Sequence, residues 1–246
     1  MKNREQIQWG IIGCGDVAEV KSGPAFQKAS DSKLLAVMRR SGAKAADFAK
    51  RHGVEFWYDS VDPFLANEDI DAVYIATPPS THVELAERSI RAGKKVYLEK
   101  PLALNLAQAH RLEACVKKHR AKLTVAHYRR ELPAFKKVSE LLRTGAIGKV
   151  LLADITILQP ARSDLIAQTA DNWRLNPEIS GGGYFHDIAP HQIDLICQFF
   201  GEAALVSGCS GIQGDQSEAP DITTGFVQFR NGVHFRGSWC FNDGDE

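Results

Sequence analysis

Short apolar segments alternate with amphipathic segments along the first half of the chain. The apolar segments have the length of buried strands, and they lie at residues 7–12, 33–38, 56–58, 72–75, 96–98 and 123–126. The amphipathic segments predict helices that begin at residue 16 or span about residues 43–52, 60–67, 81–91 and 105–118. Strands that alternate with helices in this way indicate βαβ units, with a parallel sheet and right-handed crossovers.

The second half of the chain has a different pattern. Helices are predicted at residues 134–143 and from near Asp187 to Phe200, and strands at residues 149–158, 203–212, 223–229 and 233–240. Asn231-Gly232 separates the last two strands, and this dipeptide is typical of a hairpin turn. The pattern therefore predicts antiparallel strands near the end of the chain.

Composition excludes several classes of protein. The chain has 246 residues, 44% hydrophobic and 24% charged, and its formal net charge is zero, which argues against a nucleic-acid partner held by bulk charge. Its 5 cysteines are scattered without a CxxC pair, so we expect reduced thiols, no disulfide framework and no metal site. Neither a signal peptide nor a membrane-spanning apolar run is present, so we expect a cytoplasmic protein without a membrane partner.

A glycine-rich turn follows the first predicted strand, with the sequence Gly13-Cys14-Gly15-Asp16-Val17-Ala18. In a GxGxxA turn the first glycine allows a tight turn and the second lets the backbone approach a pyrophosphate. The alanine lets helix and strand pack closely. The helix that begins at Asp16 would present free N–H groups to phosphate. The strand before this turn and the helix after it favour a dinucleotide site.

Arg39-Arg40-Ser41 ends the second predicted strand, where an acidic residue would bind the ribose 2′-hydroxyl of NAD. Guanidinium groups and a hydroxyl suit a 2′-phosphate instead, because arginine forms strong, often bidentate bonds to phosphate. The alternative is that these arginines only solvate a loop. We favour NADP(H) as the cofactor, with NAD(H) possible.

Charged and proline-containing segments end the next two strands of the predicted sheet. Ala76-Thr77-Pro78-Pro79 follows one strand, and Glu99-Lys100-Pro101 follows the next. Proline stops strand pairing at these points, and ligands bind outside the carboxyl ends of parallel strands. Lys100 is therefore expected where a ligand binds, although a lone Glu-Lys-Pro is more typical of a solvated lysine that leaves a sheet.

Three polar side chains share one face of the predicted helix that begins near residue 187. Asp187, His191 and Asp194 are spaced at i, i+4 and i+7. Taken alone, His191 is typical of a structural histidine with a neighbouring partner. Asp187 could equally be the N-cap of the helix.

Four motifs in order resemble the glucose-fructose oxidoreductase and inositol dehydrogenase family, Gfo/Idh/MocA: GIIGCGDVA, ATPPSTH, EKPLA and GGGYFHDIAPHQID. The resemblance runs from about Ile7 to the end of the chain. It implies a fold of class α/β: a Rossmann domain at residues 1–127 and an α+β substrate domain with an open, mostly antiparallel sheet at residues 128–246. It also implies a homodimer or homotetramer formed through that sheet. Because family members continue beyond residue 246, we expect a C-terminally truncated form.

The resemblance also implies an active site with Lys100 as the first candidate for general acid/base, His191 as the second, and Asp187 orienting one of them. The implied cofactor-binding residues are Gly13, Cys14, Gly15, Asp16, Val17, Arg39, Arg40, Ser41, Ala76, Thr77, Pro78, His82, Glu99, Lys100, Tyr128, Trp173 and Arg174. His127 and Tyr128 depart from the family pattern, in which Asn or Gln is common at the second position. His186 replaces an apolar residue.

We therefore predict an NADP(H)-dependent oxidoreductase that transfers hydride between nicotinamide and a secondary alcohol or ketone of a sugar, polyol or related molecule. Two alternatives remain: a glycoside hydrolase that uses retained NAD in transient oxidation, and a dinucleotide-binding regulator without turnover. A polar segment with Arg162, Asp164 and Gln168 is a further candidate for reading substrate hydroxyls.

Overall fold

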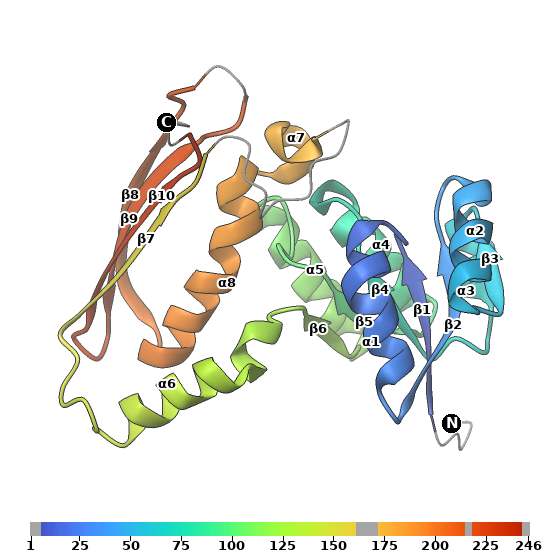
Figure 1. Cartoon of the computed structure of the whole chain (residues 1–246), viewed down its shortest axis with the longest axis horizontal. Helices are drawn as coiled ribbons and strands as arrows, with labels where there is room; N and C mark the ends of the chain where they lie inside the picture. Colours follow the sequence, from blue (N-terminus) through green and yellow to red (C-terminus); the bar gives the residue numbers. More distant parts are fainter. Residues whose placement is uncertain (1–5, 161–171, 215–217, 243–246) are drawn as a thin grey trace. The chain divides into compact units, whose positions relative to one another are not determined.

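The computed structural model describes residues 6–160, 172–214 and 218–242 and shows two compact units, Met1–Ala126 and His127–Glu246 (Figure 1). The domain boundary predicted from the sequence follows residue 127, one residue after the boundary between these units. The polar segment with Arg162, Asp164 and Gln168 lies outside the described residues.

The first unit contains a six-stranded parallel sheet. Its strands are β1 (Ile7–Ile12), β2 (Ser32–Met38), β3 (Phe56–Tyr58), β4 (Ala72–Ile75), β5 (Lys95–Leu98) and β6 (Leu123–Val125). The spatial order is β3-β2-β1-β4-β5-β6, and every pair is parallel. The order reverses between β1 and β4, so the carboxyl ends of these two strands flank the switch point at which doubly wound sheets bind ligands. The predicted doubly wound sheet is confirmed.

Helices cover both faces of this sheet. They are α1 (Gly23–Lys28), α2 (Gly42–His52), α3 (Val61–Ala66), α4 (His82–Arg91) and α5 (Leu106–His119), with short η1 (Ala18–Ser22) and η2 (Pro79–Thr81). Side chains alternate across a strand, so Ile11 packs in one core cluster with Phe48 and Tyr74, while Ile12 packs in the other with Leu98. Both clusters are apolar, as the buried strand pattern predicts.

The helix after the glycine-rich turn begins at Asp16 and passes at Ala18 into an unpredicted π-helical turn, η1. Gly23 packs so closely that a Cβ atom there would lie 2.4 Å from the carbonyl oxygen of Ala18. The Ser22 hydroxyl donates a hydrogen bond to the Val17 carbonyl at 3.1 Å. Pro24 follows in the first turn of α1. The helix therefore widens for one turn directly behind the glycine-rich turn.

The second unit combines helices with a four-stranded sheet. Its elements are η3 (Tyr128–Glu131), α6 (Pro133–Arg143), β7 (Leu152–Leu158), η4 (Trp173–Leu175), α7 (Pro177–Ser180), α8 (Gly183–Phe200), β8 (Ala203–Gly211), β9 (Ile222–Phe229) and β10 (His234–Cys240). The order is β7-β10-β9-β8. Strand β10 is antiparallel to β9 and parallel to β7, and β8 is antiparallel to β9. The sheet is mostly antiparallel, as predicted, with one parallel pair.

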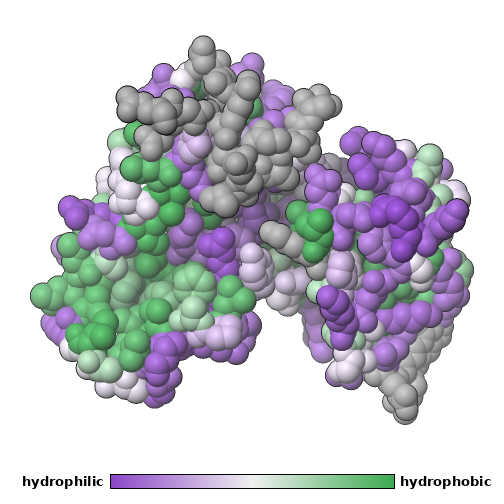
Figure 2. Space-filling model, viewed as in Figure 1, coloured by the Kyte–Doolittle hydropathy of each residue, from purple (hydrophilic) through white to green (hydrophobic). Residues whose placement is uncertain are grey.

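Helix α8 lies along the β7–β10 sheet within this unit (Figure 1). Ala189 and Ile196 on α8 pack in one apolar cluster with Phe235 and Trp239 of β10. Strand β8 is exposed along almost its whole length. Figure 2 shows hydrophobic side chains gathered on one face of this unit around α6, where Val138 is exposed. None of the helices in the described ranges combines the length and hydropathy that crossing a membrane requires.

Candidate functional site

The glycine-rich turn lies between the ends of β1 and β4. Gly13 has a left-handed φ of 93° and donates its N–H to the Met38 carbonyl at 2.9 Å. It packs so close to Ala76 that a Cβ atom on residue 13 would lie 2.8 Å from the Ala76 carbonyl oxygen. A Cβ atom on Gly15 would meet no atom within 4 Å. Only glycine fits at residue 13. At residue 15 its small size leaves open space beside the backbone that a phosphate can occupy.

The residues around Gly15 divide into exposed and buried ones. Asp16 and Val17 are exposed at the start of the helix, where backbone N–H groups have no partner within the helix. Cys14 is buried, and burial raises the pKa of its thiol. Ala18 is fully buried against the sheet. The turn therefore fits a pyrophosphate that is bound by backbone groups, with Cys14 contributing only its backbone.

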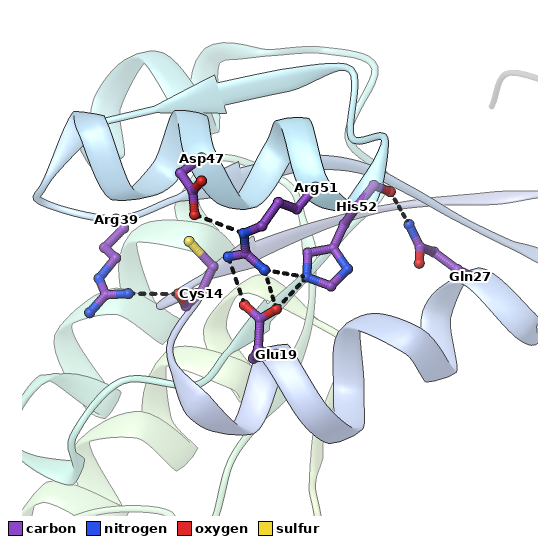
Figure 3. A network of polar contacts seen from close by, with 7 residues as sticks. All are labelled: Cys14, Glu19, Gln27, Arg39, Asp47, Arg51 and His52. Atoms are coloured by element: carbon purple, nitrogen blue, oxygen red, sulfur yellow. Dashed lines mark hydrogen bonds and ion pairs between the residues drawn. The ribbon is translucent and has the colours of Figure 1, made fainter.

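Arg39 reaches back from the end of β2 to this turn. Its Nη1 donates a hydrogen bond to the Cys14 carbonyl at 3.1 Å, as Figure 3 shows. Arg40 and Ser41 are exposed, and the Ser41 hydroxyl makes no capping bond at the start of α2. The guanidinium of Arg39 is therefore held against the glycine-rich turn, with a second arginine and a hydroxyl next to it along the chain. This set of donors fits a phosphate on the adenosine ribose.

A network of ion pairs joins the π-helical turn to α2 (Figure 3). Glu19 accepts hydrogen bonds from Arg51 and contacts His52 at 2.7 Å, and Arg51 also donates to Asp47 at 2.8 Å. The Arg51 guanidinium, followed by His52, lowers the pKa of Glu19 to about 2. Glu19 directly follows the GxGxxA sequence. The network therefore anchors the helix that would face the pyrophosphate.

The segment after β4 lies against Gly13. The Thr77 methyl group would lie 2.8 Å from a Cβ atom on Gly13, and the Thr77 and Thr81 hydroxyl oxygens lie 2.7 Å apart, within hydrogen-bond distance. The sequence predicts Ser80 or Thr81 as the cap of α4. Thr81 is the N-cap residue, but its hydroxyl donates to the Pro78 carbonyl and does not cap the helix. The side chain thereby tightens the turn that carries Thr77 and Pro78.

His82 is fully buried beneath two of the predicted ligand-binding segments. Its Nδ1 lies 2.8 Å from the Pro101 carbonyl, and its Nε2 lies 2.8 Å from the Thr77 carbonyl. Burial lowers the pKa of the imidazole, and the charge of Lys100 lowers it further. The neutral ring donates to one carbonyl at a time. Any effect of His82 on a cofactor must therefore pass through Thr77 and Pro101.

Glu99 and Lys100 end β5 beside β4. The Glu99 N–H donates to the Ile75 carbonyl at 3.0 Å, which completes the strand pairing. Its carboxylate accepts a hydrogen bond from the Tyr74 hydroxyl at 2.5 Å and one from the Lys100 N–H at 3.2 Å. Lys100 is half-buried. The sheet thus places Lys100 at the same edge as Gly13, Thr77 and Arg39.

In the second unit, α8 begins at Gly183, four residues before the predicted start. The Ser180 hydroxyl accepts a hydrogen bond from the Gly183 N–H at 3.0 Å, and Gly183 adopts a left-handed φ of 67°. These two features start the helix early. The interpretation of Asp187 as the N-cap is therefore wrong, because Asp187 lies inside α8.

The carboxylate of Asp187 pairs with Arg174 on η4. Arg174 Nε donates to Asp187 at 2.6 Å, and the two side chains are only 12% and 15% exposed. The guanidinium of Arg174 also lies over the Trp173 ring, 4.5 Å from its centre. Asp187, Arg174 and Trp173 therefore form one half-buried group, and ionic pairing fixes the Trp173-Arg174 segment on α8.

His191 lies one turn further along α8 and belongs to a different group. It is 6% exposed, and its ring is 5.2 Å from Tyr128 and 6.2 Å from His127. Asp194 binds Arg130 with both oxygens and lies 3.9 Å from His127. The shared face of α8 is confirmed in position, but its carboxylates have separate arginine partners.

Two other features lie apart from these groups: His186, which the sequence marks as a departure from the family pattern, and a hollow that the sequence did not indicate. The His186 ring lies against Gly182, where a Cβ atom would be 2.2 Å from its Nδ1, and burial lowers its pKa. An apolar hollow of about 390 Å³ lies at the opposite edge of the first sheet, lined by residues such as Trp9, Phe26 and Tyr97. No group of three His, Cys, Asp or Glu side chains within the described ranges could hold a metal ion.

Comparison with known proteins agrees with this geometry. The doubly wound sheet and the turn around Gly13 define a dinucleotide-binding protein of the Rossmann class. Residues 7–127 match the oxidoreductase family with an NAD-binding Rossmann fold, and residues 135–246 match the GFO/IDH/MocA C-terminal domain. The chain belongs to the GFO/IDH/MocA family of nicotinamide-dependent oxidoreductases, as the sequence motifs predict.

Three relatives illustrate the family. Oxidoreductase P35 of Formosa agariphila is 55% identical over 96% of this chain, which spans 73% of that protein. Inositol 2-dehydrogenase of Rhizobium meliloti is 33% identical over 85% of this chain, which spans 62% of that protein. A 3-ketoreductase from Actinomadura kijaniata, solved with NADP and TDP-benzene, is 26% identical with a TM-score of 0.82, over 97% of this chain and 71% of its own.

Proposed function

We propose that this protein uses NADP(H) to transfer hydride to or from a secondary alcohol or ketone of a sugar, polyol or related molecule. One observation carries the proposal. The open backbone at Gly15, the Arg39 guanidinium held on the Cys14 carbonyl, and Lys100 all lie at one edge of the first sheet. Relatives named as an inositol 2-dehydrogenase, a 1,5-anhydro-D-fructose reductase and a 3-ketoreductase support the substrate class.

The cofactor would be held in three parts. Backbone groups of Gly13 to Val17 would bind the pyrophosphate, and Arg39, Arg40 and Ser41 would bind a 2′-phosphate through charge-assisted hydrogen bonds. The residues proposed for the nicotinamide half are Ala76, Thr77, Pro78, Glu99 and Lys100, with Tyr128, Trp173 and Arg174 from the second unit. When bound, NADP(H) supplies the hydride, and the protein supplies position and proton transfer.

Lys100 Nζ is the proposed acid/base group for the substrate oxygen, because it is half-buried at the carboxyl end of β5. His191 is the second candidate, since it is a mostly buried imidazole of the second unit. Asp187 is bound to Arg174. We therefore assign to Asp187 the orientation of the Trp173-Arg174 segment.

The first experiment is titration with NADPH and NADH, followed by quenching of tryptophan fluorescence. Tighter binding of NADPH supports the assignment of the arginines, and tighter binding of NADH overturns it. Turnover is then measured with myo-inositol, aldoses, ketoses and 1,5-anhydro-D-fructose. Lys100→Met should lower kcat by about 10²- to 10⁴-fold, far more than it weakens NADPH binding. The matched control is Lys95→Met, which removes an exposed lysine from the start of the same strand.

The same experiment separates the two alternatives. Release of a sugar from a glycoside, with no net change in nicotinamide absorbance, would indicate the hydrolase with retained NAD. Tight nucleotide binding without turnover on the whole panel would indicate a regulator.

We also propose that copies of the chain associate through the second sheet. Strand β8 is exposed, and Leu205 and Val206 are 54% and 67% exposed. An exposed strand edge with apolar side chains is a ready surface for pairing. Light scattering after size exclusion should give a dimer or tetramer, and Leu205→Glu with Val206→Glu should give the monomer.

A further inference from the structure

We infer that Tyr74 is a positioning residue that holds Lys100 in place through the Glu99 carboxylate. The inference rests on the proposed role of Lys100, and it assigns a task to a buried tyrosine in the middle of β4. Tyr74 is 1% exposed, and every residue of β4 is buried. Packing in such a strand needs only an apolar side chain, so the hydroxyl group has another role.

Strand register explains how Tyr74 reaches Glu99. Tyr74 lies directly opposite Tyr97 in the β4–β5 pair, and Glu99 follows Tyr97 by two residues. Side chains two residues apart lie on the same face of a strand. The phenol of Tyr74 therefore extends along this face toward the carboxyl end of β5, where its hydroxyl meets the carboxylate at 2.5 Å.

Aromatic packing fixes the position of the hydroxyl. The ring of Tyr74 lies 5.4 Å from Phe26 of α1 and 5.4 Å from Tyr97, and Trp9 extends the cluster. A ring held on two sides has little freedom, so the hydroxyl is a fixed donor for the carboxylate.

The two oxygens of Glu99 transmit this position to Lys100. One oxygen accepts from Tyr74, and the other accepts from the backbone N–H of Lys100 at 3.2 Å. The peptide between Glu99 and Lys100 is therefore held at a defined orientation, which sets the direction in which the lysine side chain leaves the backbone. Burial, followed by the nearby Glu99 charge, raises the pKa of Tyr74 above its usual value, so the phenol remains a donor throughout the working pH range.

Tyr74→Phe tests the inference because it removes only the hydroxyl. The control is Tyr58→Phe, which removes another hydrogen-bonded hydroxyl from the same unit, where it accepts from Asn67. The readout is competitive acetylation of lysines with acetic anhydride, quantified by mass spectrometry. The reference is Lys94, which is buried and held by the Asn67 and Ile70 carbonyls.

In Tyr74→Phe we expect the acetylation rate of Lys100 to rise at least about threefold relative to that of Lys94. The Lys100 side chain loses its fixed position, whereas the surroundings of Lys94 do not change. Tyr58→Phe should leave this ratio unchanged. An unchanged ratio in Tyr74→Phe overturns the inference. A parallel rise at Lys94 also overturns it, because Tyr74 would then stabilise the whole core.

Turnover provides the second readout. With a substrate from the panel, Tyr74→Phe should lower kcat by about tenfold while the KM for NADPH stays constant, as expected for misplacement of a catalytic group. A normal kcat alongside a raised acetylation ratio overturns the link to catalysis. If the unmodified protein turns over no substrate, the proposed function fails, and the acetylation ratio alone still decides whether Tyr74 positions Lys100.

Discussion

Replacement of His82 by leucine removes a side chain that joins the Thr77 and Pro101 segments. Each ring nitrogen lies 2.8 Å from one of the two carbonyl oxygens, and the ring is fully buried. Leucine has a similar volume but no N–H group. His82→Leu therefore leaves a buried carbonyl without its donor and creates little empty space.

The expected cost follows from that loss. A buried acceptor that loses its donor costs about 1–3 kcal/mol, so we expect His82→Leu to lower the free energy of unfolding by about 2 kcal/mol. The free energy of unfolding falls by about 2 kcal/mol for each 1 M of urea, so this loss moves the urea midpoint of unfolding down by about 1 M. His82→Gln, whose amide can donate to one carbonyl, should lose about half as much.

The effect should also depend on pH. The pKa of His82 is lowered from 6.5 in the folded chain, so below pH 6.5 the unfolded chain takes up a proton that the folded chain resists. Stability linked to His82 is thus fully present above pH 6.5 and is lost as the pH falls below it. The difference between His82→Leu and the unmodified protein should therefore shrink between pH 7 and pH 5.5.

Hydrogen exchange in increasing urea, measured on peptides from α4 and β5, reads the first unit separately from the second. Peptides from β9 and β10 serve as the internal control and should keep their midpoint. The reasoning is refuted if His82→Leu unfolds at the same urea concentration as the unmodified protein, or if the difference is the same at both pH values.

Three further predictions concern charged groups of the first unit. Arg39→Ala should weaken NADPH binding about tenfold and leave NADH binding unchanged, and equal weakening of both in fluorescence titrations would remove the 2′-phosphate assignment. The pKa of Glu19 is about 2, below its ordinary 4.5, so its contribution to stability is complete above pH 4.5 and is lost as the pH falls toward 2. In Glu19→Gln the dependence of the melting temperature on pH between 4.5 and 2 should flatten, and an unchanged dependence contradicts the pairing. Glu87 is buried between Arg91 and Arg111, so Glu87→Gln should lower the free energy of unfolding by about 2 kcal/mol, and a loss below 0.5 kcal/mol in urea would show that solvent replaces the pair.

Most elements of the first unit could be predicted from local sequence patterns. The strand at Ile7–Ile12 and the glycine-rich turn were predicted, because a buried strand and a tight turn each depend on a few neighbouring residues. The start of α5 near residue 105 was also predicted, and the Asn105 side chain caps this helix by accepting from the Gln108 N–H at 3.0 Å. In these cases the partner lies within a few residues along the chain.

Two local features and one long-range contact were not predicted. Gly23 packs closely on Ala18 at the π-helical turn, and the Ser180 hydroxyl starts α8 early; both partners are near in the sequence, but neither contact leaves a signal in the hydrophobic pattern. The Tyr74–Glu99 bond depends on the register of β4 and β5, which the sequence pattern leaves open. A polar atom within an apolar strand was the one available signal for Tyr74.

The parallel pairing of β7 with β10 has a consequence for synthesis on the ribosome. Asp154 of β7 and Arg236 of β10 are 82 residues apart, yet they pair across the two strands. The first unit closes through local βαβ units and can fold as it emerges, whereas β7 must wait until β10 has been made. During that interval Ile155 and Ile157, which pack on the apolar cluster of the folded second unit, lie on a strand without its neighbour. The nascent second unit therefore exposes an unpaired strand until β10 has been made.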